Sequence, residues 1–183
     1  SKSSVMKKLL KIIGLLLLLV IAFVLIGGLF IKKDYHIERE IIINAPKEKV
    51  WSHVKSLQAF AKWNPFLEKD PNVKVNFTGQ EGAIGSVYEW DGNSDVGKGS
   101  QTITVADSST STFKSHLHFI KPFEGDAEGY VKLADAGSNT KVSWGFDSKY
   151  KYPMNVMTLF MDGMMKEVFD KGLGNLKKIA EAK

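Results

Sequence analysis

The chain has 183 residues, of which 44% are hydrophobic and 25% charged, proportions that exclude a disordered or collagen-like protein. It contains no cysteine, which excludes disulfide-stapled scaffolds, cysteine nucleophiles and thiolate zinc sites. Of its 25 basic residues, six precede the first acidic residue, Asp34, which leaves 19 basic against 20 acidic residues in the rest. The basic charge therefore belongs to the N-terminal segment, and we expect no nucleic-acid partner.

Residues 12–31 form an uninterrupted stretch of 20 uncharged residues with lysines on both sides. As an α-helix this stretch spans about 30 Å, the thickness of the hydrocarbon core of a bilayer. A cleaved signal peptide and a buried helix are the alternatives, but the stretch is long for a signal core and no clear cleavage motif follows it. We predict a membrane anchor in 1–33, with the transmembrane helix at about 12–31, and a folded domain in 34–183.

The orientation of this anchor is set by a small difference in charge. Four lysines lie on the short N-terminal side, against two lysines and one arginine just after the stretch. The excess favours a single-pass protein with its N-terminus in the cytoplasm and its folded domain outside.

The folded domain begins with a predicted strand at 36–43, which is rich in β-branched residues. Asn44 is expected to cap a helix at 47–55, with Pro46 in the first turn, where its missing N–H is harmless. A second short helix is expected at 57–63, ended by the Asn-Pro pair that follows.

A strand-rich segment comes next. Because short polar turns separate its strands, neighbouring strands should pair antiparallel. In one of them Phe113 and Leu117 share an apolar face, while His116 and His118 share a polar one, so the sheet should be covered on one side only. The expected strands are 73–78, 86–90, 97–107, 112–120, 125–134 and 140–150.

Residues 154–182 predict a long amphipathic helix that covers the apolar face of the sheet, with Asn155 placed to cap its start. We therefore predict an α+β fold: a seven-stranded curved antiparallel sheet, two short helices and a long C-terminal helix, preceded by one N-terminal transmembrane helix. Five methionines fall on the apolar side of the long helix: Met154, Met157, Met161, Met164 and Met165.

This order of elements resembles the helix-grip fold of the START-like, or SRPBCC, superfamily, and within it the bacterial polyketide cyclase/dehydrase-like branch. The resemblance rests on IEREIIINAPKEKVWSHV with LQAFAKWNPF after it, on GAIGSVYEWDGNSDVGKGSQTI, and on FDKGLGNLKKIAE near the C-terminus. It covers residues 35–183 and implies a deep cavity between the sheet and the C-terminal helix. Members range from lipid and hormone carriers to cyclases and oxygenase components, so the fold does not determine the function.

The methionine stripe and the aromatic residues of the strands are the candidates for the wall of such a cavity. Methionine is flexible and polarizable, so the stripe can line an adaptable pocket for apolar ligands, or it can fill an ordinary core. Tyr88 and Trp90 share one strand face and can give a cavity a few polar contacts. The candidate ligand-binding residues are Trp63, Phe66, Tyr88, Trp90, Phe113, Leu117, Trp144, Phe146, Met157, Met161, Met164 and Met165.

Catalytic and metal-binding chemistry receive less support from the sequence. His116 and His118 have a spacing found in metal sites, but they lie on the polar face and lack a third ligand nearby, so we expect surface histidines and no metal. Asp162 lies beside the methionine stripe. Its carboxylate could lie at the cavity rim, but a solvated position on the helix is the simpler interpretation. No nucleophile or nucleotide-binding motif occurs, so we expect no cofactor and identify no catalytic set.

The leading hypothesis is a membrane-tethered domain that binds a hydrophobic small molecule, a lipid or a polyketide-like compound, without turning it over. Its partners would be that ligand and the bilayer, the latter through residues 12–31, and the sequence does not say whether it has protein partners. One alternative is a cyclase or dehydratase that acts on a poly-carbonyl substrate. A second alternative is an interaction or scaffold module with a filled core and no ligand.

Overall fold

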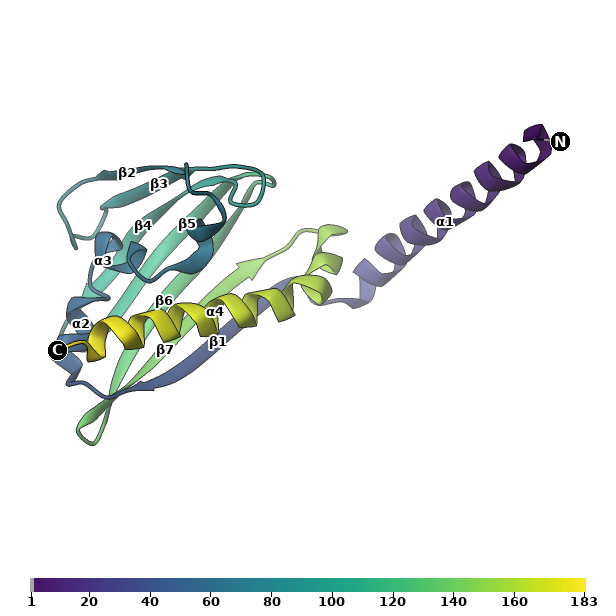
Figure 1. Ribbon diagram of the computed structural model, residues 1–183. Helices are drawn as coiled ribbons and strands as arrows, with labels where there is room; N and C mark the ends of the chain where they lie inside the picture. Colours follow the sequence, from purple (N-terminus) through teal and green to yellow (C-terminus); the bar gives the residue numbers. More distant parts are fainter. Residues whose placement is uncertain (1) are drawn as a thin grey trace.

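The computed structural model describes residues 2–183 and shows a sheet-and-helix body (residues 34–183) from which one long helix projects (Figure 1). The elements in chain order are α1 (Lys2–Phe30), β1 (Asp34–Ile43), α2 (Lys47–Ser52), α3 (Leu57–Ala61), the 3₁₀ helix η1 (Pro65–Lys69), β2 (Lys74–Thr78), β3 (Val87–Asp91), β4 (Lys98–Asp107), β5 (Thr112–Lys121), β6 (Gly125–Ala136), β7 (Asn139–Lys149), the 3₁₀ helix η2 (Met154–Met157) and α4 (Thr158–Glu181). This is the predicted order, and the predicted α+β helix-grip fold is confirmed.

The seven strands form one antiparallel sheet in the order β1-β7-β6-β5-β4-β3-β2. Strands β2 to β7 follow one another as neighbours, whereas β1 pairs with β7, so that Asp34 lies opposite Lys149 and Ile43 opposite Thr140. The pairing of β4 with β5 is irregular at two places, and such bulges bend strands. The sheet therefore curves around the space beneath α4 (Figure 1).

The two faces of the sheet differ as the period-two alternation predicted. Phe113 and Ser115 of β5 are buried on the concave face, while Lys114 between them is exposed on the convex face. His116 lies on the same convex face, where its ring contacts the carboxylates of Asp126 and Glu128. Because only the concave face is apolar, only that face needs to be covered by α4.

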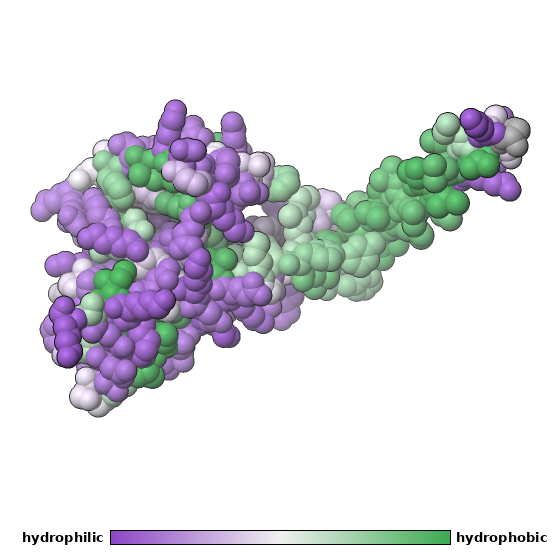
Figure 2. All heavy atoms as spheres, in the orientation of Figure 1, coloured by the Kyte–Doolittle hydropathy of each residue, from purple (hydrophilic) through white to green (hydrophobic). Residues whose placement is uncertain are grey.

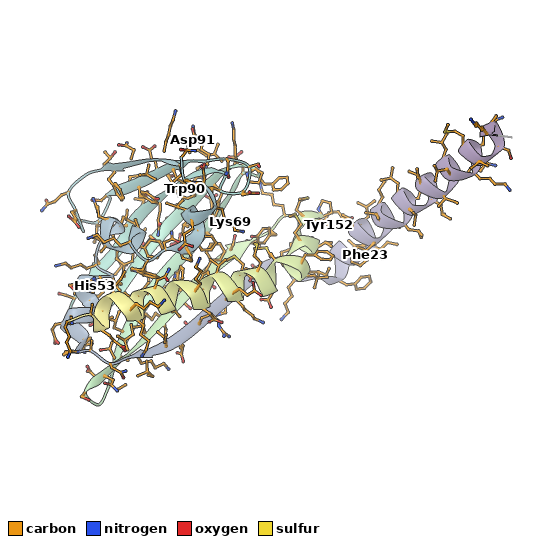
Figure 3. All side chains as sticks on the ribbon, in the orientation of Figure 1. Phe23, His53, Lys69, Trp90, Asp91 and Tyr152 are labelled. Carbon is orange, nitrogen blue, oxygen red and sulfur yellow. The ribbon has the colours of Figure 1, made fainter. Side chains whose placement is uncertain are left out.

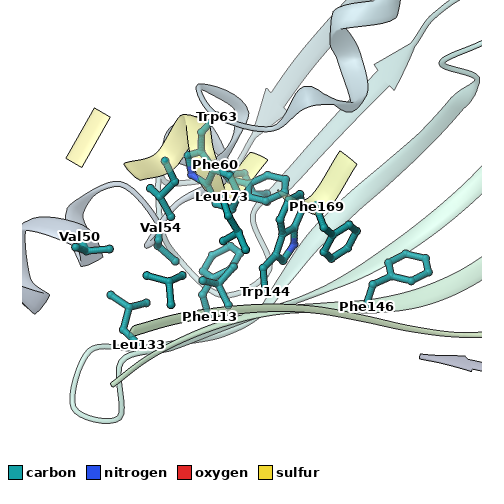
Figure 4. Close-up of a cluster of buried hydrophobic side chains, with 14 of the residues drawn as sticks. Val50, Val54, Phe60, Trp63, Phe113, Leu133, Trp144, Phe146, Phe169 and Leu173 are labelled. Atoms are coloured by element: carbon teal, nitrogen blue, oxygen red, sulfur yellow. The ribbon is translucent and has the colours of Figure 1, made fainter. Parts of the chain in front are cut away.

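Helix α4 packs most closely against β7 at Phe169, near its middle, and its side chains contact β1 from Asp162 to Lys177. The ring of Phe169 stacks on Trp144 of β7 with a centroid distance of 4.0 Å and an interplanar angle of 19°. Trp144 also meets Trp63 edge to face at 5.0 Å, and Phe60 lies against both rings (Figure 4). This aromatic cluster, with Leu173, Leu176 and Ala180 of α4 also buried, fixes the helix at one end of the sheet.

Gly172 makes this close approach possible. A Cβ atom at this position would lie 2.5 Å from the Trp144 ring and 3.1 Å from Pro65, both closer than ordinary van der Waals contact. The missing side chain lets the backbone of α4 come down onto the indole, although glycine in a helix interior costs about 1 kcal/mol relative to alanine.

Two predicted helix caps are wrong, because tertiary partners take the place of local ones. The side chain of Asn44 does not cap α2, whose N-cap residue is Pro46 and which has no side-chain cap. The Asn44 backbone N–H donates to the Glu181 carboxylate of α4 at 2.6 Å. Asn155 is buried in η2, ahead of α4, and its side chain donates to backbone carbonyls at the end of α1. The cap of α3 is Ser56, whose hydroxyl accepts from the Ala59 N–H at 3.1 Å.

Helix α1 is long and apolar enough to cross a membrane, and its apolar window is fully exposed, as the green helix in Figure 2 shows. It is one continuous helix of 29 residues, longer than the apolar stretch because the basic N-terminal residues are helical too. Its C-terminal end contacts η2, so the helix is attached to the body at the end where α4 begins (Figure 1).

The role of Gly172 can be tested by adding a methyl group. Gly172→Ala should lower the free energy of unfolding by about 1–3 kcal/mol, because overpacking against the Trp144 ring outweighs the gain in helix propensity. Gly174→Ala in the same helix is the control: nothing lies within 4 Å of its added methyl group, so it should raise the free energy by about 0.5–1 kcal/mol. Urea unfolding of the full chain in mild detergent measures both changes, and equal effects would contradict this packing.

Candidate functional site

A cavity of about 1180 Å³ lies between the N-terminal half of α4 and the concave face of β3, β4, β5, β6 and β7. It exists because α4 is held close to the sheet at Trp144 and stands away from it at its methionine half. The methionines Met154, Met157, Met161, Met164 and Met165 all line it. Met165 among them also belongs to the buried core, and Met161 packs against that core, so the stripe contributes both to the cavity wall and to the core.

Eleven of the twelve candidate ligand-binding residues line this cavity: Phe66, Tyr88, Trp90, Phe113, Leu117, Trp144, Phe146, Met157, Met161, Met164 and Met165. The exception is Trp63, which is buried in the aromatic cluster behind the cavity and donates its indole N–H to the His53 carbonyl at 2.9 Å. Phe66 is partly exposed, and its ring lies 6.4 Å from that of Trp144.

The deepest polar groups of the cavity come from three adjacent strands. Tyr88 of β3 pairs in register with Gln101 of β4, and the Gln101 side-chain amide donates to the Ser115 hydroxyl of β5 at 2.7 Å. All three side chains line the cavity and are buried. Gln101 and Ser115 were not among the predicted residues, although alternation places Ser115 on the same strand face as Phe113 and Leu117 and could have identified it.

Tyr88 is the polar group with the least satisfied surroundings. It is 2% exposed, and its hydroxyl finds no hydrogen-bond partner within residues 2–183. Burial raises the pKa of this phenol to about 12, so the hydroxyl is neutral and protonated at physiological pH. A buried hydroxyl without a partner costs about 1–3 kcal/mol, and an oxygen acceptor on a bound molecule would remove that cost.

The charged residues of the lining lie at the mouth of the cavity. Four lysines and three carboxylates contribute, and each of these residues is exposed. They lie in turns, at strand ends, before β1 and between β7 and η2. In chain order they are Lys33, Asp95, Lys121, Glu124, Asp126, Lys149 and Lys151. The mouth therefore opens beside the α1 junction, and the deep wall that the structure describes is apolar or neutral.

The remaining titratable candidates lie outside the cavity wall. Asp162 pairs with Lys166 at 2.7 Å and accepts from the Tyr35 hydroxyl at 3.3 Å, so its carboxylate is engaged at the surface. His116 lies 2.7 Å from Glu128 and 3.1 Å from Asp126. Among residues 2–183, no group of three His, Asp or Glu side chains is arranged to hold a metal ion.

The histidine cluster predicts a modest dependence of stability on pH. The hydrogen bond to Glu128 raises the pKa of His116 above its usual value. The pairing therefore stabilises the fold fully below the unfolded pKa of about 6.5, and this contribution is lost as pH rises through the folded pKa. Because the pair is exposed and screened, His116→Gln should cost at most about 1 kcal/mol at pH 6 and less at pH 8. Thermal unfolding at both pH values measures this, and an equal cost at both would contradict it.

Known structures resemble this fold at low sequence identity. Norcoclaurine synthase from Thalictrum flavum, solved in complex with dopamine and hydroxybenzaldehyde, superposes with a TM-score of 0.63 at 11% identity and covers 82% of this chain and 88% of its own. A protein from Thermobifida fusca gives 0.62 at 15% identity, covering 79% and 92%. One from Nitrosospira multiformis gives 0.58 at 18%, covering 79% and 94%. At these identities the likeness establishes the fold alone.

Sequence comparison adds the family. A search among curated proteins finds no match. The family described as polyketide cyclase / dehydrase and lipid transport matches residues 34–181. That segment contains all seven strands, both short α-helices and α4. The body of this protein thus has both the fold and the sequence pattern of one family, and the chain belongs to the polyketide cyclase / dehydrase and lipid transport family.

Proposed function

We propose that this protein binds an apolar small molecule that carries an oxygen acceptor, a lipid or a polyketide-like compound, in the cavity under α4. The observation that carries the proposal is the cavity itself, about 1180 Å³ in volume with an apolar deep wall. Pockets that hold drug-sized ligands have volumes of about 300–1,000 Å³. Burial of an apolar ligand is favoured by about 25 cal/mol for each Å² removed from water.

The composition of the wall supports a ligand of variable shape. Rigid aromatic rings from the sheet form one side, while the five methionines of η2 and α4 form the other. Thioether side chains change rotamer at little cost and adapt to irregular apolar surfaces. Such a wall favours a class of related apolar molecules over one molecule of fixed outline.

The buried polar residues support a ligand with one polar end. Tyr88 offers an unpartnered donor, and the amide of Gln101 and the hydroxyl of Ser115 lie on the neighbouring strands. Because these groups are neutral, they suit a carbonyl or hydroxyl, or a carboxyl group in its protonated form, better than a fixed charge. Filled-core scaffolding, the non-ligand alternative, finds no support in this arrangement.

The membrane tether is part of the proposal. Helix α1 is long, apolar and exposed, and lysines flank its apolar stretch, which supports a retained single-pass anchor over a cleaved signal sequence. The excess of lysines before the stretch favours a body on the outer side of the membrane. A tether of this kind would keep the cavity close to a source of apolar ligands.

A cyclase or dehydratase is the second candidate, and Tyr88 is the observation in its favour. Its hydroxyl is the buried group of the cavity best placed to donate a proton to a carbonyl oxygen. With a pKa of about 12 it is a poor base, so this chemistry would be limited to proton donation or hydrogen bonding. Chromatography coupled to mass spectrometry of a poly-carbonyl compound after incubation distinguishes the two functions, since cyclisation changes the retention time, dehydration also removes the mass of one water, and binding alone returns the compound unchanged.

Occupancy of the cavity can be tested on the full chain released from membranes in mild detergent. Native mass spectrometry should retain one apolar adduct per chain. Met161→Trp should retain less of this adduct, because the larger ring takes up part of the cavity beside α4. Glu167→Trp, on an exposed position of the same helix, should keep it. A wild-type chain without any adduct, or equal occupancy in both variants, would contradict the proposed function.

Two probes separate the hydrogen bond of the Tyr88 hydroxyl from nonspecific binding of apolar molecules. Tyr88→Phe should weaken binding of a fluorescent fatty acid about tenfold, the loss of one hydrogen bond worth about 1.4 kcal/mol. Binding of diphenylhexatriene, which has no oxygen, should stay the same. The variant should be no less stable than the wild type, since the hydroxyl lacks a protein partner. Equal weakening for both probes would show that the hydroxyl does not contact the ligand.

A further inference from the structure

The end of α1 is held by the segment that leads into α4. The side-chain amide of Asn155 donates to the carbonyl oxygens of Gly28 and Ile31 at 2.8 and 2.7 Å. The hydroxyl of Tyr152 donates to the carbonyl of Leu25 at 2.9 Å. These bonds satisfy carbonyls in the last turns of a helix, which lack partners within it or share them. We call Tyr152 and Asn155 the clamp.

The clamp fixes the depth, relative to the bilayer, of the end of the body that contacts α1. Leu25 precedes Ile31, the last residue of the uncharged stretch, by six residues, or about 9 Å along a helix. If residues 12–31 span the hydrocarbon core of a bilayer, then the Tyr152 hydroxyl bonded to Leu25 lies among the acyl chains, within about 9 Å of their boundary with the headgroups. Tyrosine is enriched at that boundary, where its ring contacts apolar groups and its hydroxyl contacts polar ones. Figure 3 shows Tyr152 at the junction of the body with α1.

The mouth of the cavity is at this same end. Tyr152, Met154 and Met157, which belong to the segment that holds α1, also line the cavity. Phe123 in the β5–β6 turn lines it from the other side and is 60% exposed. Phe160 in the first turn of α4 is 72% exposed, and Leu159 next to it is exposed as well. In Figure 2 the apolar surface of α1 continues onto the adjoining end of the body.

We propose that this apolar rim, made of Phe123, Tyr152, Met154, Met157, Leu159 and Phe160, inserts into the interface of a phospholipid bilayer and opens the cavity toward the acyl chains. This inference rests on the membrane tether of the proposed function. It adds a fixed orientation of the body, in which the clamp holds the mouth of the cavity at the membrane surface. The ligand then exchanges with the bilayer without crossing water. Large exposed apolar side chains grouped in this way are typical of membrane-contacting surfaces.

The charges around the mouth indicate which membrane the rim fits. Four lysines and three carboxylates line it, and Lys149 already pairs with Asp34 at 3.6 Å. Since these charges nearly cancel, apolar insertion and not attraction to anionic lipid drives the contact. The pose should therefore be the same in bilayers of neutral phosphatidylcholine and in bilayers with added anionic lipid.

Depth measurements on the full chain in phosphatidylcholine nanodiscs test the pose. Because the chain has no cysteine, a single Phe160→Cys, Phe123→Cys or Ser138→Cys substitution allows selective labelling with the fluorophore NBD. Ser138 lies in the β6–β7 turn, at the end of the body away from α1 (Figure 1). Nitroxide-labelled lipids should quench NBD at 160 and 123 at least threefold more than NBD at 138. Equal, weak quenching at all three positions would overturn the inference.

The role of the clamp can be tested with two variants of neighbouring glycines in α1. A Cβ at Gly28 would lie 3.1 Å from the Tyr152 ring and 3.3 Å from the Asn155 side-chain oxygen. At Gly27 it would meet only the side chains of Phe23 and Ile31, at 3.9 Å or more. Gly28→Leu should therefore release the body and lower quenching at 160, and Gly27→Leu should leave it unchanged. Equal quenching in both variants would overturn the role of the clamp.

The outcome can be separated from that of the proposed function. NBD depth is read without added ligand, and fatty-acid binding is measured on the same chain in detergent. Binding without insertion would overturn only the membrane pose. Insertion without binding would overturn the ligand and leave the rim as a membrane contact.

Discussion

The stacking of Phe169 on Trp144, with Gly172 beside it, is the contact on which the rest of the structure depends. It brings α4 within van der Waals distance of β7 at Phe169 and Gly172. Because the helix is straight and the sheet curves, close contact at one end leaves a gap at the other. The cavity is thus a consequence of where one aromatic pair holds the helix, and the methionines line one side of the space that remains.

Polarity is distributed in this cavity so that charge stays at the mouth and neutral groups lie deep. Lysines and carboxylates belong to exposed turns and strand ends, where water solvates them. Tyr88, Gln101 and Ser115 lie on adjacent strands inside. A molecule that enters with its polar end first would exchange hydrogen bonds with water for bonds to these groups, and its apolar part would meet rings and thioethers. The same arrangement suits a carrier and, with proton donation from Tyr88, a cyclase.

The sequence was sufficient for the architecture because the architecture follows from local patterns. Alternation placed Phe113 inside and His116 outside, and the helical period placed Met161 over the sheet. The failures have a common cause, since each depends on a partner distant in sequence. Asn155 has the composition of a cap but bonds to Gly28, 127 residues away. Gln101 is buried because β4 lies between β3 and β5, a pairing that its own segment does not specify. Trp63 lies outside the cavity wall because its ring packs against Trp144.

The most direct measurement is a high-resolution crystal structure of the full chain extracted from membranes without removal of lipid. We expect continuous non-protein density along the methionine half of α4, with an oxygen within hydrogen-bond distance of the Tyr88 hydroxyl. Density that shows the space filled by the protein's own side chains, with α4 lying directly on β5 and β6, would contradict the central claim.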